Sequence, residues 1–333
     1  MLQKRTIQLK VGFFKKQWFL LTLAVVLAVG MGFAPAFEAL QQIRWLKWTV
    51  VSITMFLIVW PFSFGKLTET LLKPQAALLA TVINSVVMPL AVWPFALLVG
   101  NEIGAGMVVA FAAPCTVVSA AVWTRRAGGD DRIAILVTLI TNLICFLNAP
   151  FWIWLLTGSE QNSVDRFSGT ATKLLMFVVL PIVVAQVVRL NLKSANWATS
   201  QKKQLGIVSQ IGLLFIVFLG SIQSGMRIRD ADSNFPVVEL VAGVACLLLV
   251  HLLVLYFGKW IAGVLKMTHE EQVAVGFAGS QKTLMVGLSI AVSLQVTILP
   301  LLAFHSLQLV IDTLIADRMV NEQPPRREIA NRL

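Results

Sequence analysis

The sequence predicts an all-α integral membrane protein with about ten transmembrane helices, arranged as two inverted five-helix repeats. Three observations predict this fold class. Long stretches of the chain carry no charge, the basic residues alternate between two sides, and two similar strings lie half a chain apart.

Composition places the chain in a lipid bilayer. Of its 333 residues, 57% are hydrophobic and 13% are charged, whereas soluble domains carry about a quarter charged residues. A helix needs about 20 mostly apolar residues to span a bilayer. Uncharged runs occupy 18–35, 48–64, 74–101, 103–124, 133–159, 174–188, 205–226, 240–258, 272–281 and 283–311. The last run is too long for one span and is divided by a turn at 293–295. Pro114 lies in the middle of the run 103–124 and interrupts the fourth span. Lys282 interrupts the ninth span, which combines 272–281 with the start of the last run, and the rest of that run forms the tenth.

The basic residues predict the topology, because cytoplasmic loops carry an excess of Lys and Arg. With the amino terminus inside, twenty of the 27 Lys and Arg residues fall on the cytoplasmic side, six fall outside, and Lys282 lies within the membrane. Both termini are therefore expected in the cytoplasm. A basic start before the run 18–35 is also found in secretory signal peptides, but this apolar stretch is long for one.

An internal repeat divides the ten spans into halves. The string 111–116 (FAAPCT) is similar to 277–283 (FAGSQKT), and their phenylalanines are 166 residues apart. An odd number of spans in each half inverts one half relative to the other. We expect a first repeat at 1–157, an external loop at 158–170, a second repeat at 171–316 and a cytoplasmic tail at 317–333. Inverted repeats with interrupted helices mark midplane binding sites in secondary transporters.

The charged residues inside the spans are candidate functional residues. Lys282 is the most informative, because a cation at mid-membrane costs at least about 2.5–3.5 kcal/mol. His305, Gln308 and Asp312 follow helical spacing and share one face, and Asp312 is a candidate partner for Lys282. Asp312 also lies close to the predicted cytoplasmic edge, which leaves the pairing open. His251 is interpreted as a buried, hydrogen-bonded histidine, with a proton relay as the alternative.

Uncharged polar residues lie on the predicted third, fourth and fifth spans. The third span carries Asn84 and Ser85, and the fourth carries Thr116 and Ser119. The fifth carries a stripe of polar residues at helical spacing, which consists of Thr138, Thr141, Asn142, Cys145 and Asn148. Such groups join helices in membranes. They also coordinate hard cations and polar substrates. Their convergence with two interrupted helices favours a site.

The motifs of several other classes are absent from the sequence. It has no Gly-rich phosphate loop, no His/Cys metal spacing, no nucleophile elbow and no potassium-channel filter repeat. The chain is therefore expected to be neither an enzyme nor an ATP-driven pump, and to hold no cofactor. The net charge of +11 resides mainly in loops and does not indicate nucleic-acid binding. The three cysteines lie within spans and suggest no disulfide framework.

The strings 112–120 and 124–130 resemble the fourth-span region of the bile acid:sodium symporter family, specifically the divergent branch typified by solute carrier family 10 member 7. The strings 279–284 and 298–302 resemble the same branch. The resemblance implies a core domain of spans 3–5 and 8–10 and a panel domain of spans 1, 2, 6 and 7. It also implies that spans four and nine are broken and cross in the core, with substrate between core and panel.

One departure from this family pattern concerns sodium. Ordinary members have a Glu-x-Gly-x-Gln string in span nine, whereas Phe277 stands here in place of the carboxylate. The resemblance leaves Thr138 and Gln281 as candidate residual sodium ligands, and Lys282 adds a positive charge beside them. Because two adjacent cations repel strongly in a low dielectric, we interpret the Lys282 ammonium as a replacement for one sodium ion. Transport would then be uncoupled from sodium or coupled to protons.

The sequence predicts a secondary active transporter of the symporter type that carries a small organic anion across the plasma membrane. That membrane would be a bacterial inner membrane. The alternative is a non-transporting membrane regulator of cation (calcium) entry, which the resemblance to the branch suggests. The candidate substrate- and ion-binding residues are Lys282, Gln281, Ser280, Thr283, Thr116, Ser119, Thr138, Asn142, Asp312 and His305. The partners are the anion and the bilayer, and the sequence leaves the oligomeric state open.

Overall fold

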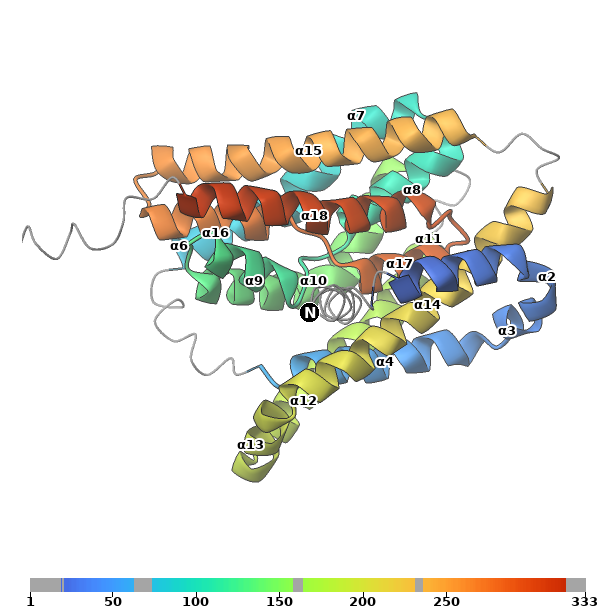
Figure 1. Ribbon diagram of the computed structural model, residues 1–333, viewed down its shortest axis with the longest axis horizontal. Helices are drawn as coiled ribbons and strands as arrows, with labels where there is room; N and C mark the ends of the chain where they lie inside the picture. The colour runs from blue at the N-terminus through green and yellow to red at the C-terminus, as the bar shows by residue number, and fades with distance from the viewer. Residues whose placement is uncertain (1–18, 20, 63–73, 158–163, 231–235, 322–333) are drawn as a thin grey trace, which may run out of the picture.

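The structure is a computed structural model that describes residues 19, 21–62, 74–157, 164–230 and 236–321 (Figure 1). The described chain is built from helices, with no strand among these residues. Seven helices are long and apolar enough to cross a membrane: Gln75–Leu98, Asp131–Leu156, Asp165–Arg189, Lys202–Arg229, Val237–Val264, His269–Ser293 and Leu299–Val320. A pair bent by 92°, Leu21–Gly32 with Ala34–Gln42, gives an eighth candidate, and two shorter apolar helices cover Trp45–Val59 and Glu102–Ala112. The chain is thus an integral multi-pass membrane protein.

The helices form two packed groups. We call the first the core group; it consists of α6 (Gln75–Val82), η2 (Ile83–Val87), α7 (Met88–Leu98), α8 (Asn101–Ala112), α9 (Ser119–Arg126), α10 (Asp131–Leu156), α15 (Val237–Val264), α16 (His269–Ser280), α17 (Leu284–Ser293) and α18 (Leu299–Asn321). The second is the panel group; it consists of α2 (Ala34–Phe37), α3 (Ala39–Gln42), α4 (Arg44–Val59), α11 (Val164–Leu174), η3 (Leu175–Val179), α12 (Leu180–Arg189), α13 (Leu192–Ser200) and α14 (Lys202–Asp230). The groups meet where α10 packs on α11 and α14 packs on α17.

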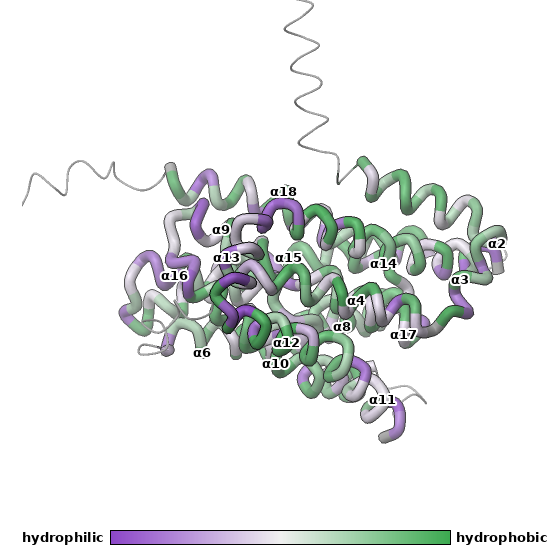
Figure 2. The backbone as a smooth tube through the Cα atoms, turned by 90° about the horizontal axis from the view of Figure 1, so that it is seen from below, coloured by the Kyte–Doolittle hydropathy of each residue, from purple (hydrophilic) through white to green (hydrophobic). Residues whose placement is uncertain are grey.

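The distribution of polar residues fits a bilayer. Hydrophilic stretches gather around α16 and α13 at one end of the molecule, and around α3 and α11 at the other (Figure 2). Between these ends the long helices expose large apolar side chains, such as Val241 and Leu253 on α15. Helix α11 begins at Val164, inside the segment 158–170 that the sequence predicts to be a loop, while 158–163 lie outside the described residues.

Prolines create two π-helical turns in the core and panel groups. Pro89 follows η2 and Pro181 follows η3, and a proline cannot donate to the carbonyl four residues earlier. Those carbonyls are satisfied from other helices, because lipid offers no partner. The Trp152 indole N–H donates to Ser85 O at 2.6 Å, and the Ser52 hydroxyl donates to Phe177 O at 3.3 Å.

Candidate functional site

Two interrupted helices meet in the core group. Helix α8 ends at Ala112 and α9 begins at Ser119, while α16 ends at Ser280 and α17 begins at Leu284. Helix α8 packs against α17, and α9 packs against α16. The two unwound segments are joined directly, since the Thr283 N–H donates to Pro114 O at 2.9 Å. We call residues 113–118 the first break and residues 281–283 the second break.

Proline causes the first break. A residue before proline is pushed out of the helical region, and Ala113 is extended, with φ −60° and ψ 150°. The stripe predicted on the fifth span satisfies the freed backbone. Thr138 Oγ1 donates to Thr116 O at 2.9 Å, and Asn142 Nδ2 donates to Cys115 O at 2.9 Å. These side chains therefore hold the first break open.

No proline lies in the second break, and a side chain from another helix caps it instead. Asn84 Nδ2 donates to Ala278 O, Gly279 O and Gln281 O at 3.1, 3.3 and 2.8 Å. These carbonyls stand at the end of α16, where a helix lacks its own donors. Gln281 and Thr283 are extended, with ψ 140° and 131°. The end of α16 is therefore fixed by η2.

The Lys282 ammonium lies between the two breaks and η2, with its side chain enclosed by protein. Its Nζ donates to Asn84 O at 2.6 Å, Asn84 Oδ1 at 3.1 Å and Ala113 O at 2.9 Å. An ammonium has three donors, so all three are used. The Asn84 carbonyl is free to accept because Met88 N–H bonds to Ile83 O in the π-turn and Pro89 has no N–H. Neutral oxygens thus surround the cation.

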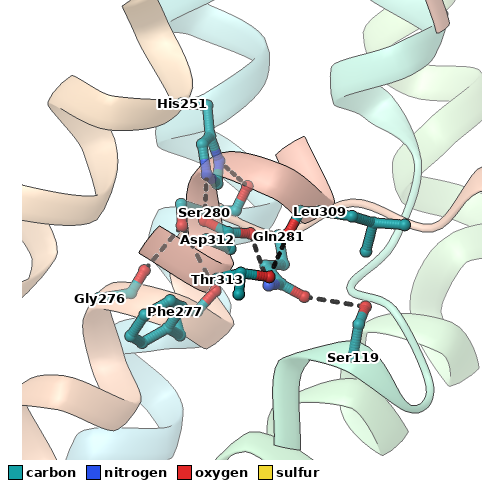
Figure 3. Close-up of polar contacts among 9 residues, drawn as sticks. All are labelled: Ser119, His251, Gly276, Phe277, Ser280, Gln281, Leu309, Asp312 and Thr313. Carbon is teal, nitrogen blue, oxygen red and sulfur yellow. Dashed lines mark hydrogen bonds and ion pairs between the residues drawn. The ribbon is translucent and has the colours of Figure 1, made fainter. Parts of the chain in front are cut away.

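Asp312 does not bond to Lys282. It is buried on α18, and both of its carboxylate oxygens are occupied by other partners. Oδ1 lies 2.8 Å from His251 Nε2, and Oδ2 accepts from Gln281 Nε2 at 2.7 Å (Figure 3). The candidate pairing of Lys282 with Asp312 is therefore replaced by a contact between α15 and α18. His251 is the satisfied buried histidine that the sequence favours.

A polar chain continues from Asp312 to the first break. Gln281 Oε1 accepts from the Ser119 hydroxyl at 3.0 Å (Figure 3), and that hydroxyl lies 2.8 Å from Thr116 Oγ1. Ser119 is half-exposed at the start of α9. This series of hydrogen bonds thus runs from the buried His251 and Asp312 side chains to the edge of the core group.

The structure brings most of the sequence-predicted residues together. Residues that belong to one of the breaks or form hydrogen bonds with one are Thr116, Ser119, Thr138, Asn142, Gln281, Lys282, Thr283 and Asp312. Ser280 ends α16, and its hydroxyl donates to Gly276 O of the same helix at 2.9 Å. His305 is half-buried on α18 beside the Lys282 backbone. Asn142 Oδ1 has no hydrogen-bond partner among the described residues, and the same holds for both amide atoms of Gln308. Within the described chain, no cluster of three or more His, Cys, Asp or Glu residues could hold a metal ion.

Two residues that are not among the ten candidate binding residues complete the site. Asn84 connects η2 to the second break, and its signal in the sequence is its place five residues before Pro89. His251 closes the site from α15. The sequence identifies this histidine as buried, but only the packing of α15 on α18 shows its partner.

A separate cavity of about 530 Å³ lies between the panel group and the far end of α17. Lys47 and Lys173 line it, together with an aromatic wall of Trp45, Trp48 and Phe177. Gln223 and Ser293 also line it, and each has one buried side-chain oxygen without a partner among the described residues. Its size is that of a small-molecule site, and its charge suits an anion.

Comparison with known proteins gives one consistent family. A model of the SBF-like CPA transporter family matches residues 17–321. The chain is 25% identical to a probable chloroplastic sodium/metabolite cotransporter of Arabidopsis thaliana, over 89% of this chain and 71% of the relative. It is 24% identical to sodium/bile acid cotransporter 7 of Mus musculus, over 90% of this chain and 92% of the relative. An uncharacterized protein of Pseudomonas aeruginosa is 25% identical, over 66% of this chain and 67% of the relative.

Proposed function

Because this chain belongs to the SBF-like CPA transporter family, we propose that it is a secondary transporter that carries a small organic anion across a membrane. Its family consists of transporters, not enzymes. The observation that carries the proposal is the meeting of two interrupted helices, with Lys282 buried between them. Interrupted helices at membrane depth are tolerated where they line a site, and secondary transporters bind substrates and ions there.

The proposed topology has ten spans with both termini in the cytoplasm of a bacterial inner membrane. The seven long helices, the bent pair and the two shorter apolar helices supply the ten segments. The first break directly follows the fourth of them, and the second break lies within the ninth. Each half therefore has its interruption in the same place, which supports an inverted repeat over 1–157 and 171–316. Cytoplasmic Lys and Arg residues support the orientation.

The proposed substrate is an anion with an apolar body. Lys47 and Lys173 supply positive charge in the cavity, and the aromatic wall supplies apolar contact. The Arabidopsis and mouse relatives are named for a metabolite and for bile acids, and conjugated bile acids have this chemistry. We propose that substrate enters through this cavity and that the conformational change of the transport cycle takes place at the two breaks.

In this proposal the Lys282 ammonium takes the place of a sodium ion, so transport is not coupled to sodium. The named cotransporters are sodium-dependent by name, but here an ammonium already holds the oxygens around Lys282. The residual candidate ligands are engaged, since Thr138 donates to Thr116 O and both ends of the Gln281 amide are bonded. Lys282, Gln281, Thr138 and Asn142 would then organise the breaks without a sodium ion.

The test is uptake of a radiolabelled conjugated bile acid by proteoliposomes, with protein-free liposomes as the blank. We expect uptake in potassium medium without added sodium. Lys47→Gln and Lys173→Gln should each raise KM several-fold, whereas Lys193→Gln, an exposed lysine on α13 outside the cavity, should not. Absence of uptake of the bile acid and of smaller carboxylates would reject the transport proposal and favour the regulator of cation entry.

A further inference from the structure

A second cavity adjoins the cavity described above. Its volume is about 340 Å³, and it lies between α11 and the turn that follows α17. The two cavities share three lining residues, which are Lys173, Ser293 and Gln295. We call these three residues the junction, because the first cavity and the second cavity meet there.

One face of α11 runs along both cavities. Arg166, Thr170 and Lys173 line the second cavity at spacings of i, i+4 and i+7, which place them on one helical face. Phe177 lies about one turn beyond Lys173 and lines the first cavity. The spacing of Arg166 and Lys173 corresponds to about 10 Å along a helix axis. These two residues therefore supply separate positive charges along the same wall.

The first cavity also provides an apolar surface. The Trp48 ring stacks on Phe177, with centroids 5.2 Å apart, and Lys47 Nζ lies 5.6 Å from the Trp48 centroid. Leu294 provides an apolar contact in the second cavity. An aliphatic chain that crosses the junction would therefore meet apolar side chains on both sides of it.

Basic residues outnumber acidic residues around the two cavities. Among the described residues that line them, Lys47, Lys173 and Arg166 are basic, and Asp165 is acidic. Asp165 precedes Arg166 at the start of α11 and is exposed. Each cavity thus has a basic residue of its own in addition to Lys173, which they share. A ligand with one anionic group in each cavity would balance more of this charge than a monoanion.

Gln295, at the junction, has a backbone conformation that favours glycine. Its φ is 55°, and Lys266, with φ 58°, is the other non-glycine residue of the described chain with a positive φ. The Val296 N–H donates to Ala291 O at 2.9 Å. This bond closes α17 with a Schellman motif, which usually has glycine where Gln295 stands. Because glutamine is less stable than glycine in this conformation, a residue that lines both cavities lowers the stability of the fold.

We propose that the two cavities form one elongated site for an organic dianion, with one anionic group in each cavity, and that Gln295 determines this specificity at the junction. The inference rests on the proposed function only for the transport of this ligand. One anionic group binds Lys47 in the first cavity, and the other binds Arg166 in the second. Lys173 lies between them, and the Gln295 amide donates to the group in the second cavity.

Matched probes test the site without transport. Sebacate has a carboxylate at each end of an aliphatic chain, and monomethyl sebacate has the same chain with one carboxylate esterified. Succinate has two carboxylates but is too short to reach both cavities. Because a ligand that binds only the folded state stabilises it, the melting temperature of the full chain in lipid nanodiscs at constant ionic strength measures binding. Sebacate should saturate at a concentration about tenfold lower than either control, since each control loses the charge-assisted hydrogen bonds of one carboxylate.

A variant of Arg166 tests where the second anionic group binds. In Arg166→Gln, sebacate should bind about tenfold more weakly and lose its advantage over the half-ester. Lys193→Gln, which alters an exposed lysine on α13 outside both cavities, should keep that advantage. Equal stabilisation of the wild type by sebacate and its half-ester, or none by sebacate, would overturn the dianion site. An Arg166→Gln variant that still prefers sebacate would overturn it as well.

The backbone of Gln295 supplies a second readout. Gln295→Gly should raise the melting temperature of the ligand-free protein by a few degrees, because glycine is favoured at a positive φ. It should also weaken sebacate binding about tenfold, because the amide donor is lost. Unchanged sebacate binding by this variant would overturn the role of the Gln295 side chain.

Lys266→Gly is the matched control for this variant. The Met267 N–H donates to Ala262 O at 3.0 Å, so the end of α15 has the same motif. Lys266 lines neither cavity. Lys266→Gly should therefore raise the melting temperature to a similar extent and leave sebacate binding unchanged.

Transport is measured separately, as uptake of radiolabelled sebacate by proteoliposomes. We expect uptake by the wild type that succinate inhibits about tenfold less effectively than unlabelled sebacate. Preferential binding of sebacate without any uptake would confirm the dianion site and contradict the proposed transport function. Uptake of a conjugated bile acid by a protein that does not bind sebacate would leave the transport function standing and overturn this inference.

Discussion

Replacement of Lys282 by alanine should convert the site between the breaks into a sodium site. The variant loses the ammonium but keeps the three oxygens that bind it, Asn84 O, Asn84 Oδ1 and Ala113 O. It also leaves room for an ion where the side chain lay. Oxygens of this kind are the ligands that hard cations prefer.

The magnitude follows from the contacts. Three hydrogen bonds to a charged donor contribute about 1.5–3 kcal/mol each. Removing the buried cation relieves about 3 kcal/mol. The free energy of unfolding should therefore fall by about 2–6 kcal/mol. At a free sodium concentration of about a hundred times its Kd, binding of the ion would restore about 2.7 kcal/mol of the free energy of unfolding.

The assay is the melting temperature of purified protein in detergent, with NaCl compared with KCl at equal ionic strength. Lys282→Ala should melt several degrees below the wild type and recover with sodium only. Lys282→Met fills the space with an apolar chain and should show no recovery. A saturable, sodium-specific rise in the wild type would refute the reasoning, and so would a Lys282→Ala variant that ignores sodium.

Three further substitutions test the scaffold of the site by the same melting assay. Asn84→Ala should cost about 2–5 kcal/mol, because it removes the cap of α16 and an acceptor of the ammonium; a change below about 1 kcal/mol would contradict the capping role. Gly104→Ala should cost about 1–3 kcal/mol, because its Cβ would overlap the α7 backbone. Gly206→Ala, whose Cβ meets open space, is the matched control and should be neutral or stabilising. Trp152→Phe should cost about 1–3 kcal/mol by leaving Ser85 O unsatisfied, and an unchanged melting temperature would show that this bond contributes nothing.

The sequence predicts those parts of the site that depend on local chemistry. Pro114 in an apolar run predicts a break because proline excludes its predecessor from a helix, and Ala113 is extended as expected. Lys282 is identifiable because an ammonium in an uncharged run has few explanations. The stripe containing Thr138 and Asn142 follows from helical spacing alone. The family resemblance is confirmed by the family model.

The partners of Lys282 and Asp312 could not be predicted from spacing. They depend on a π-turn that frees one carbonyl of η2, and on the packing of α15 against α18. Helical periodicity places Asp312 on a face but does not identify which neighbour reaches it first. The second break has no proline, and its cap comes from a residue nearly two hundred positions away. Such contacts exist only once the core group is assembled.

The fixed position of the Lys282 ammonium also has an electrical consequence. A sodium ion adds its charge only while it is bound, whereas this cation is present in the loaded and the empty carrier alike. Lys282 and Asp312 carry opposite charges within one buried network, so these two side chains add no net charge to the empty site. A monovalent anion that is carried without a cation then makes the loaded carrier more negative by one charge. A membrane potential does work of about 2.3 kcal/mol per charge per 100 mV. The cycle would therefore run at different rates in an energised and a depolarised membrane.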